Sequence, residues 1–209
     1  MPLQSLFLKS LLKWIIFLFG IFCFTSRLWA QEIYHFGADH STIQGSIQYS
    51  LVGQYKAHFE KFKGTIEYDP KKNMIRFVSL QIEAASVKSE FPRLDHIVCS
   101  SRLLDVHKYP FITFESRHIE RGKDGFKAKG DLFLHGVKRG IVFPFKLEQG
   151  KTADAKIRMK VTGQWRIPRK DYTIIFNKLF DHGGILVGDY ITVTWEVTAY
   201  REVKKRMKK

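Results

Sequence analysis

The chain has 209 residues, which is long enough for one domain with a substantial core and short for two. Its formal net charge of +15 suits nucleic-acid binding, but no base-reading motif accompanies the charge, so we exclude nucleic acid as a partner. The basic excess favours attraction to anionic lipid headgroups, with a merely solvated exterior as the simpler alternative.

The first thirty residues differ from the rest of the chain. Lys9 and Lys13 precede an uninterrupted apolar run over Trp14–Phe24, which is too short to span a membrane because a span needs about 20 residues. A basic start, a short apolar middle and a small residue at the exit, here Ala30, are typical of a secretory signal. We therefore predict a signal peptide over residues 1–30, cleavage near Ala30 and a periplasmic or secreted protein. An uncleaved N-terminal anchor is the alternative.

Cleavage at this place removes Cys23 and leaves Cys99 as the only cysteine. One thiol cannot form an intramolecular disulfide, so the exported domain must be stable through burial alone. No recognisable nucleophile motif surrounds Cys99, and we interpret it as a small apolar filler.

From Glu32 onward the sequence alternates between apolar and polar residues, the period of two that marks strands with one dry face. The clearest hairpin joins residues 126–134 to residues 141–147 through a turn around Gly136. In total we predict eight strands, over residues 41–51, 62–68, 78–84, 112–120, 126–134, 141–147, 155–167 and 191–199.

Two segments interrupt the strands. Residues 92–101 lack alternation and begin with Pro92, which suits a first helical turn, so we predict a short helix there. Residues 171–187 form a second irregular segment. The domain organisation is then one β domain over residues 31–200, followed by a basic tail over residues 201–209.

Eight sequential strands with one dry face must bury that face and protect their edges. Closure into an eight-stranded antiparallel β-barrel does both and leaves room for side chains or one small ligand. A two-sheet sandwich is the alternative fold. Small residues on the dry faces favour a hollow barrel, although bends or close sheet packing explain each of them singly. They are Gly45, Gly64, Ala84, Ala128, Gly130, Ala155, Gly163 and Ala199.

The large residues on the same faces are the candidates for the wall of an apolar tunnel. For each of them an ordinary place in the core is at least as good an explanation as contact with a ligand. They are Ile47, Tyr49, Phe62, Ile66, Leu80, Ile82, Phe114, Leu132, Phe143, Phe145, Met159, Val161, Trp165, Val193 and Trp195.

The sequence gives little support for an enzyme. The eight histidines show neither an HExxH motif nor a close pair of metal ligands, and no GxSxG elbow is present, so we predict no catalytic residue, metal or cofactor. Arg93, Asp95, His96 and Asp105 are expected to cluster near one end of the barrel, and we interpret them as a salt-bridged loop clasp rather than an active site.

Four sequence blocks together resemble one known family. KYPFITFES (108–116) followed by GDLFLHGVK (130–138) is the most specific pair of motifs. The other blocks are DHS (39–41) with FEKFKG (59–64) and YDP (68–70), SV (86–87) with RLD (93–95) and LDVH (104–107), and VGD (187–189). In order and spacing the chain resembles the YceI-like family of bacterial exported proteins over essentially all of its length after residue 30.

The resemblance implies a lipocalin-like eight-stranded barrel, all-β with one or two short helical or loop insertions, that binds a polyisoprenoid in an apolar tunnel. We therefore predict a non-catalytic protein that holds a long isoprenoid-type lipid, such as a polyprenyl quinone, for transport or storage in the periplasm. The alternative is a module that docks on an anionic membrane or an acidic partner through its basic surface, without a lipid tunnel. A hydrolase is less favoured, and a homodimer is left open.

Overall fold

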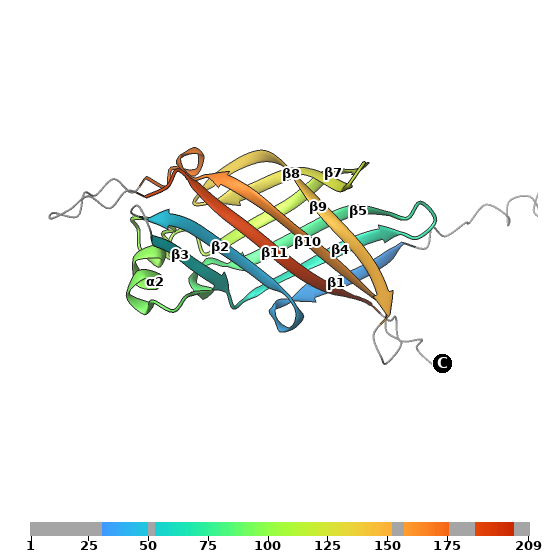
Figure 1. The fold of residues 1–209 in the computed structure, drawn as a ribbon, viewed down its shortest axis with the longest axis horizontal. Helices are drawn as coiled ribbons and strands as arrows, with labels where there is room; N and C mark the ends of the chain where they lie inside the picture. Colours follow the sequence, from blue (N-terminus) through green and yellow to red (C-terminus); the bar gives the residue numbers. More distant parts are fainter. Residues whose placement is uncertain (1–30, 50–52, 152–156, 176–186, 203–209) are drawn as a thin grey trace, which may run out of the picture. The chain divides into compact units, whose positions relative to one another are not determined.

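The structure is a computed structural model that describes residues 31–49, 53–151, 157–175 and 187–202 (Figure 1). Among these residues no helix is long and apolar enough to cross a membrane. The strands are β1 (Glu32–Gly37), β2 (Thr42–Tyr49), β3 (Gly53–Phe59), β4 (Phe62–Asp69), β5 (Met74–Glu83), β6 (Val87–Lys88), β7 (Phe111–Gly122), β8 (Gly125–Leu134), β9 (Val137–Lys151), β10 (Ile157–Pro168) and β11 (Tyr190–Arg201). One α-helix, α2 (Pro92–Cys99), and three short 3-10 helices, η1 (Ala38–His40), η2 (Ala84–Ser86) and η3 (Arg169–Tyr172), connect them.

Eight of these strands form a closed antiparallel ring in the order β1-β4-β5-β7-β8-β9-β10-β11. The ring closes where Tyr34 and His35 of β1 pair with Arg201 and Tyr200 of β11. The predicted eight-stranded antiparallel barrel is therefore confirmed, and the sandwich alternative is wrong.

The membership of the ring differs from the prediction. The strand predicted over residues 41–51 is β2, which pairs with β11 but not with β1, and β3 and β6 extend the sheet from β2. Its expected place in the ring is taken by β1, which the sequence pattern did not reveal. Strand β1 is six residues long and buries only Tyr34 and Phe36, which is too short for a clear alternation.

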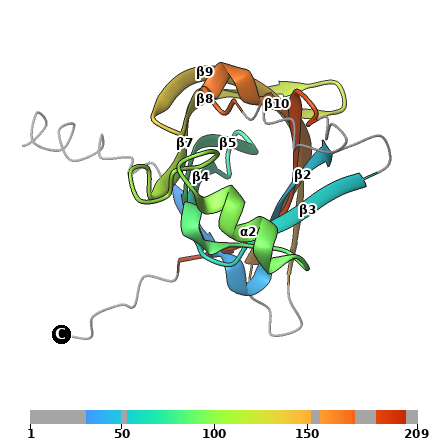
Figure 2. The same cartoon turned by 90° about the vertical axis from the view of Figure 1, so that its left-hand side faces the viewer.

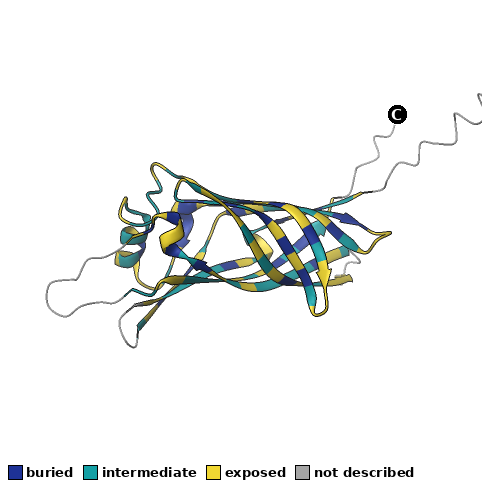
Figure 3. Cartoon of the chain, turned by 90° about the horizontal axis from the view of Figure 1, so that it is seen from above, coloured by how far each residue is buried: buried dark blue, intermediate teal, exposed yellow. Residues whose placement is uncertain are grey.

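The hairpin of β8 and β9 agrees closely with the one predicted from the sequence. Leu134 pairs with Val137 across a two-residue loop, His135 and Gly136, which both have positive φ, at 50° and 76°. This backbone is a type I′ turn, whose twist matches that of the strands it joins. The hairpin and its turn around Gly136 are as predicted. Figure 3 shows the alternation along the strands as buried and exposed bands.

Several glycines on the inner face are covered by aromatic rings and leave no hollow. A Cβ at Gly64 would collide with the ring of Phe36 and with the carbonyl oxygen of Ser79, and one at Gly163 would collide with Trp195. Both pairs lie opposite each other on neighbouring strands. Gly130 is covered in the same way by Phe114. The interpretation of these three glycines as open space is wrong, because each makes room for a ring.

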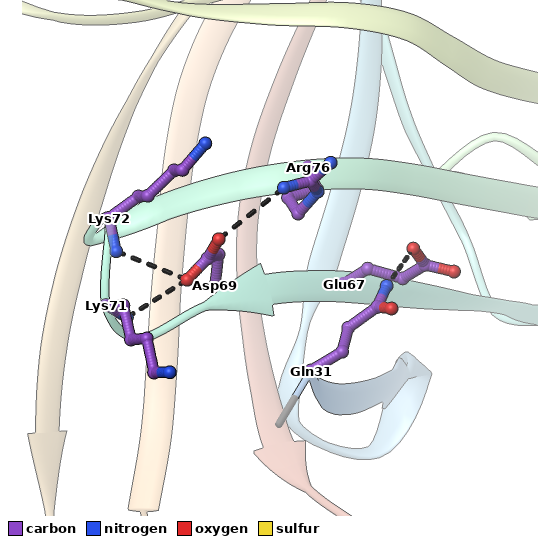
Figure 4. A network of polar contacts seen from close by, with 6 residues as sticks. All are labelled: Gln31, Glu67, Asp69, Lys71, Lys72 and Arg76. Carbon is purple, nitrogen blue, oxygen red and sulfur yellow. Dashed lines mark hydrogen bonds and ion pairs between the residues drawn. The ribbon is translucent and has the colours of Figure 1, made fainter. Parts of the chain in front are cut away.

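The barrel end opposite α2 is held by polar contacts at the turn between β4 and β5 (Figure 4). Asp69 accepts hydrogen bonds from the backbone N–H groups of Lys71 and Lys72, at 3.0 and 3.2 Å, and its carboxylate also faces Arg76 at 3.5 Å. Burial acts to raise the pKa of Asp69, but these donors outweigh it and lower the pKa. Gln31 donates to Glu67 beside this turn.

We expect Gly64→Ala to lower the free energy of unfolding by about 1–3 kcal/mol, because the added Cβ meets both a packed ring and a backbone carbonyl that cannot move aside. Thermal unfolding of the variant measures this change. Gly150→Ala is the matched control, since the nearest atom to a Cβ there, in Arg158, is 3.7 Å away. Equal stability of the two variants would contradict the ring-over-glycine packing.

Candidate functional site: an apolar cavity

The barrel encloses a cavity of about 590 Å³, a volume within the range of small-molecule sites. All eleven strands and α2 contribute to its wall. The lining is apolar apart from a few residues with polar side-chain groups, among them Ser46, Tyr55, Thr113 and Arg169. The cavity is thus a site for a hydrocarbon group and not for a polar solute.

Most of the residues predicted to form a tunnel wall lie around this cavity. The lining includes Ile47, Ile66, Leu80, Ile82, Phe114, Leu132, Phe143, Phe145, Val161, Trp165, Val193 and Trp195. Phe62 and Met159 are buried in the core but do not line the cavity, which corrects the predicted wall. The side chain of Tyr49 lies outside the described residues. Alternation along a strand identifies the inner face but not the depth at which a residue meets the hollow.

An aromatic cluster forms one side of the wall. The ring of Phe143 lies 5.1 Å from Phe114, 6.2 Å from Trp165 and 5.2 Å edge-on from Trp195, measured between ring centroids. These separations are within the range of favourable aromatic pairs. Two tryptophans in the wall make their fluorescence a direct reporter of anything that enters the cavity.

Helix α2 and the loop after it close part of one barrel end, which Figure 2 faces. Pro92 starts the helix in its first turn. Leu94, Ile97 and Val98 recur at helical spacing and so share the face that lines the cavity. Leu103 and Leu104 of the following loop also line it. The sequence predicted the helix, but its role in the wall was missed, although the spacing of Leu94, Ile97 and Val98 is the signal that reveals it.

Asp95 fixes α2 to the barrel. Its buried carboxylate accepts hydrogen bonds from the Tyr55 hydroxyl at 2.7 Å and from the hydroxyl and backbone N–H of Ser89 at 2.5 and 3.1 Å. Burial acts to raise the pKa of Asp95, but these hydrogen bonds and the charge of Lys88 outweigh it and lower the pKa. The prediction of a salt-bridged clasp is therefore wrong for Asp95, whose partners are two hydroxyl groups and a backbone N–H rather than Arg93 or His96.

Arg169 is the one charged residue in the described cavity lining, and its side chain is almost fully buried. Its guanidinium donates to the backbone carbonyls of Gly188 and Ile174, both at 2.8 Å, and of Val187 at 3.4 Å. Asp189 lies 4.0 Å from it and binds Lys170 at 2.7 Å. These bonds tie η3 to the start of β11 and leave the charge compensated within the protein.

The histidines and Cys99 are dispersed over the part of the chain that the structure describes. No group of three histidine, cysteine, aspartate or glutamate side chains there is arranged to hold a metal ion. His135 is half-buried and bonded to the Tyr172 carbonyl, and His182 lies outside the described residues. The other histidines, His35, His40, His58, His96, His107 and His118, are exposed. Cys99 is a free thiol packed beside Val98, and burial raises its pKa, which disfavours the reactive thiolate.

The fold and cavity together define a lipocalin-like barrel, a class that holds apolar ligands inside a closed sheet. The sequence profile of the YceI-like domain matches residues 34–199, and the chain belongs to this family. A UPF0312 protein of Vibrio cholerae is 28% identical over 137 residues, which cover 65% of this chain and 72% of the relative.

Two solved structures show the same fold. BcnA of Burkholderia cenocepacia has a TM-score of 0.65 at 19% identity, covering 76% of this chain and 95% of BcnA. A domain of Saccharophagus degradans has a TM-score of 0.60 at 14% identity, covering 83% of this chain and 99% of that domain. The second is described as a polyisoprenoid-binding domain implicated in plant cell wall breakdown.

We expect Asp95→Ala to lower the free energy of unfolding by about 1–3 kcal/mol, because it leaves the buried hydroxyl of Tyr55 and the half-buried hydroxyl of Ser89 without their acceptor. Chemical denaturation measures the loss, and His96→Ala, an exposed position on the same helix, is the control. An Asp95→Ala variant as stable as the wild type would contradict the anchoring of α2 by this carboxylate.

The same carboxylate predicts a dependence on pH. The folded-state pKa of Asp95 lies below its unfolded value of about 4. The contribution of this carboxylate to the free energy of unfolding is therefore complete above about pH 4 and is lost as the pH falls through the folded-state pKa. The stability difference between wild type and Asp95→Asn should therefore be constant near neutral pH and shrink below about pH 4. A difference that grows on acidification would exclude this role.

Proposed function

We propose that this protein is a non-catalytic carrier that holds an isoprenoid-type lipid in the barrel cavity, for transport or storage in the periplasm. The observation that carries the proposal is the apolar cavity itself, lined from every strand of the barrel. Each CH₂ group of a ligand buried there contributes about 0.8 kcal/mol, so a hydrocarbon chain can bind firmly without any catalytic or ionic group.

The polar groups of the lining support the same class of ligand. The Tyr55 hydroxyl is bonded to Asp95, and the Arg169 guanidinium is bonded to three carbonyls, so neither is left to recognise a solute. The cavity walls therefore select a ligand by its apolar chain. The polyisoprenoid binding stated for the Saccharophagus degradans domain favours an isoprenoid among the apolar chains. The signal-like leader over residues 1–30 supports export.

Titration with a polyprenyl quinone tests the proposal. We expect the fluorescence of the folded protein to change saturably, because Trp165 and Trp195 line the cavity and a quinone quenches emission on contact. The change should be reduced in Trp165→Phe and in Trp195→Phe and lost when both are replaced. No saturable change in the wild type, with the fold intact by circular dichroism, would contradict a lipid site in the barrel.

A second candidate, docking on an anionic membrane, is favoured by the exposed apolar side chains at the α2 end. Among the described residues five large apolar side chains are exposed, and four of them, Phe91, Phe111, Ile175 and Tyr190, lie at this end. Aromatic side chains suit the membrane interface, and the basic excess of the chain attracts anionic headgroups. Docking there would present the cavity to the lipid that it takes up.

Binding to phosphatidylglycerol vesicles tests this candidate. We expect the wild type to co-sediment with vesicles at low salt and the Phe91→Ser/Phe111→Ser variant to bind at least about fivefold more weakly, because it removes apolar area from the contact. Val142→Ser is the matched control, since Val142 on β9 is 50% exposed and Phe91 is 49% exposed. Equal vesicle binding of all three proteins would contradict docking through the α2 end.

A further inference from the structure

Near the end opposite α2, Ile75 of β5 and Phe145 of β9 still line the cavity, but on five other strands of the ring the lining stops earlier. On each of these five strands, the last residue that lines the cavity is followed, at the next inward-facing position, by a buried residue that does not line it. Phe36 lines the cavity and Tyr34 does not, and Val161 lines it and Met159 does not. The same boundary separates Ile66 from Tyr68, Ala128 from Phe126, and Val197 from Ala199.

The five residues beyond this boundary, Tyr34, Tyr68, Phe126, Met159 and Ala199, form a plug at the end of the barrel opposite α2. The rings of Tyr34 and Tyr68 meet edge to face with centroids 6.2 Å apart, and Met159 lies opposite Ala199 on the neighbouring strand. Met159 and Ala199 have no exposed surface, and Tyr34 is 1% exposed. All five residues belong to the hydrophobic core, and none of them lines the cavity.

Hydrogen bonds hold the plug in place from outside. The Tyr34 hydroxyl donates to Glu32 at 2.8 Å, and the Tyr68 hydroxyl donates to Asn73 at 2.6 Å. Glu32 in turn binds Arg201 at 2.7 Å, next to the pairs that close the ring. Both tyrosines are thus fixed at the ring and at the hydroxyl, so a ligand that pushes against them must break these bonds.

The depth above the plug follows from strand geometry. The inward residues of β11 that line the cavity run from Ile191 to Val197, about 20 Å along a strand at ~3.3 Å per residue. A tilt of about 40° to the barrel axis reduces this to ~15 Å of depth. The volume sets the limit in carbon atoms: at the ~30 Å³ that a water molecule occupies in the liquid, taken as the room for one carbon with its hydrogens, 590 Å³ holds roughly 20 carbons.

We propose that the plug makes this cavity a ruler that encloses a single prenyl or acyl chain of about 20 carbons and leaves the remainder of a longer chain outside. The inference rests on the proposed function and specifies its ligand class. Affinity must then depend on chain length only until the chain reaches the plug. The headgroup stays at or beyond the α2 end, because the Tyr55 hydroxyl and the Arg169 guanidinium of the lining are already bonded within the protein.

A series of prenyl alcohols tests the ruler on the full chain, with geraniol, farnesol, geranylgeraniol and solanesol as probes and tryptophan fluorescence as the readout. We expect affinity to rise at least about tenfold with each step up to geranylgeraniol, since every buried CH₂ is worth up to about fourfold. From geranylgeraniol to the much longer solanesol we expect a change of less than about threefold.

Two variants should change, in opposite directions, the chain length at which affinity stops rising. Ala128→Leu fills the deep end of the cavity, where Ala128 lines it next to Phe126, and should bring the limit down to farnesol. Met159→Ala removes the bulk beyond Val161 and should make solanesol bind at least about fivefold more tightly than geranylgeraniol. Lys127→Leu, an outward neighbour on β8, is the control and should leave the limit unchanged.

The outcomes separate the ruler from the function on which it rests. A wild-type affinity that continues to rise steeply from geranylgeraniol to solanesol would overturn the ruler while supporting the lipid site. The ruler would also be overturned if affinity stops rising at geranylgeraniol in both variants while circular dichroism shows that both are folded. Failure of all four alcohols to bind would contradict the proposed function, and the ruler with it. Because the variants act in opposite directions, one folded variant suffices for the test.

Discussion

Closure of the sheet between β1 and β11 is the constraint on which the rest of the structure depends. Pairing of Tyr34 and His35 with the end of β11 joins the two ends of an eight-stranded ring. Because side chains alternate along every strand, closure turns all of the apolar faces toward one interior and removes the edges of the ring. The interior is then too wide for its side chains to fill at the α2 end, whereas the plug residues at the other end pack into the hydrophobic core.

The chemistry of the cavity depends on how the buried polar groups in and around it are bonded. A buried carboxylate or guanidinium is tolerated only where hydrogen bonds replace water, and Asp95 and Arg169 both meet this condition with groups of the protein. Their bonds serve to position α2 and η3 around the end of the barrel. What remains for a ligand is hydrocarbon surface, so binding is governed by the area of chain that is buried rather than by charge.

Much of this architecture was predictable from the sequence, because apolar and polar residues that alternate with a period of two indicate which residues share a face. That pattern predicted the eight-stranded barrel, the β8–β9 hairpin and the inward orientation of Trp165 and Trp195. The lack of alternation after Pro92, a residue that suits a first helical turn, predicted the short helix. The alternation could not distinguish a glycine that leaves space from one, such as Gly163, that is covered by a ring from the next strand. Nor could it give depth: Val161 and Met159 share a face, yet one lines the cavity and the other belongs to the plug.

The central claim is that the cavity exists to hold a hydrocarbon chain. Its most direct test is mass spectrometry of the organic extract from the protein purified, without detergent, from its native cells. The account predicts an isoprenoid or another single-chain lipid at close to one molecule per protein, lost from the extract when the cavity is filled by bulky substitutions. An extract free of lipid, from folded protein that also takes up none from added membranes, would contradict it.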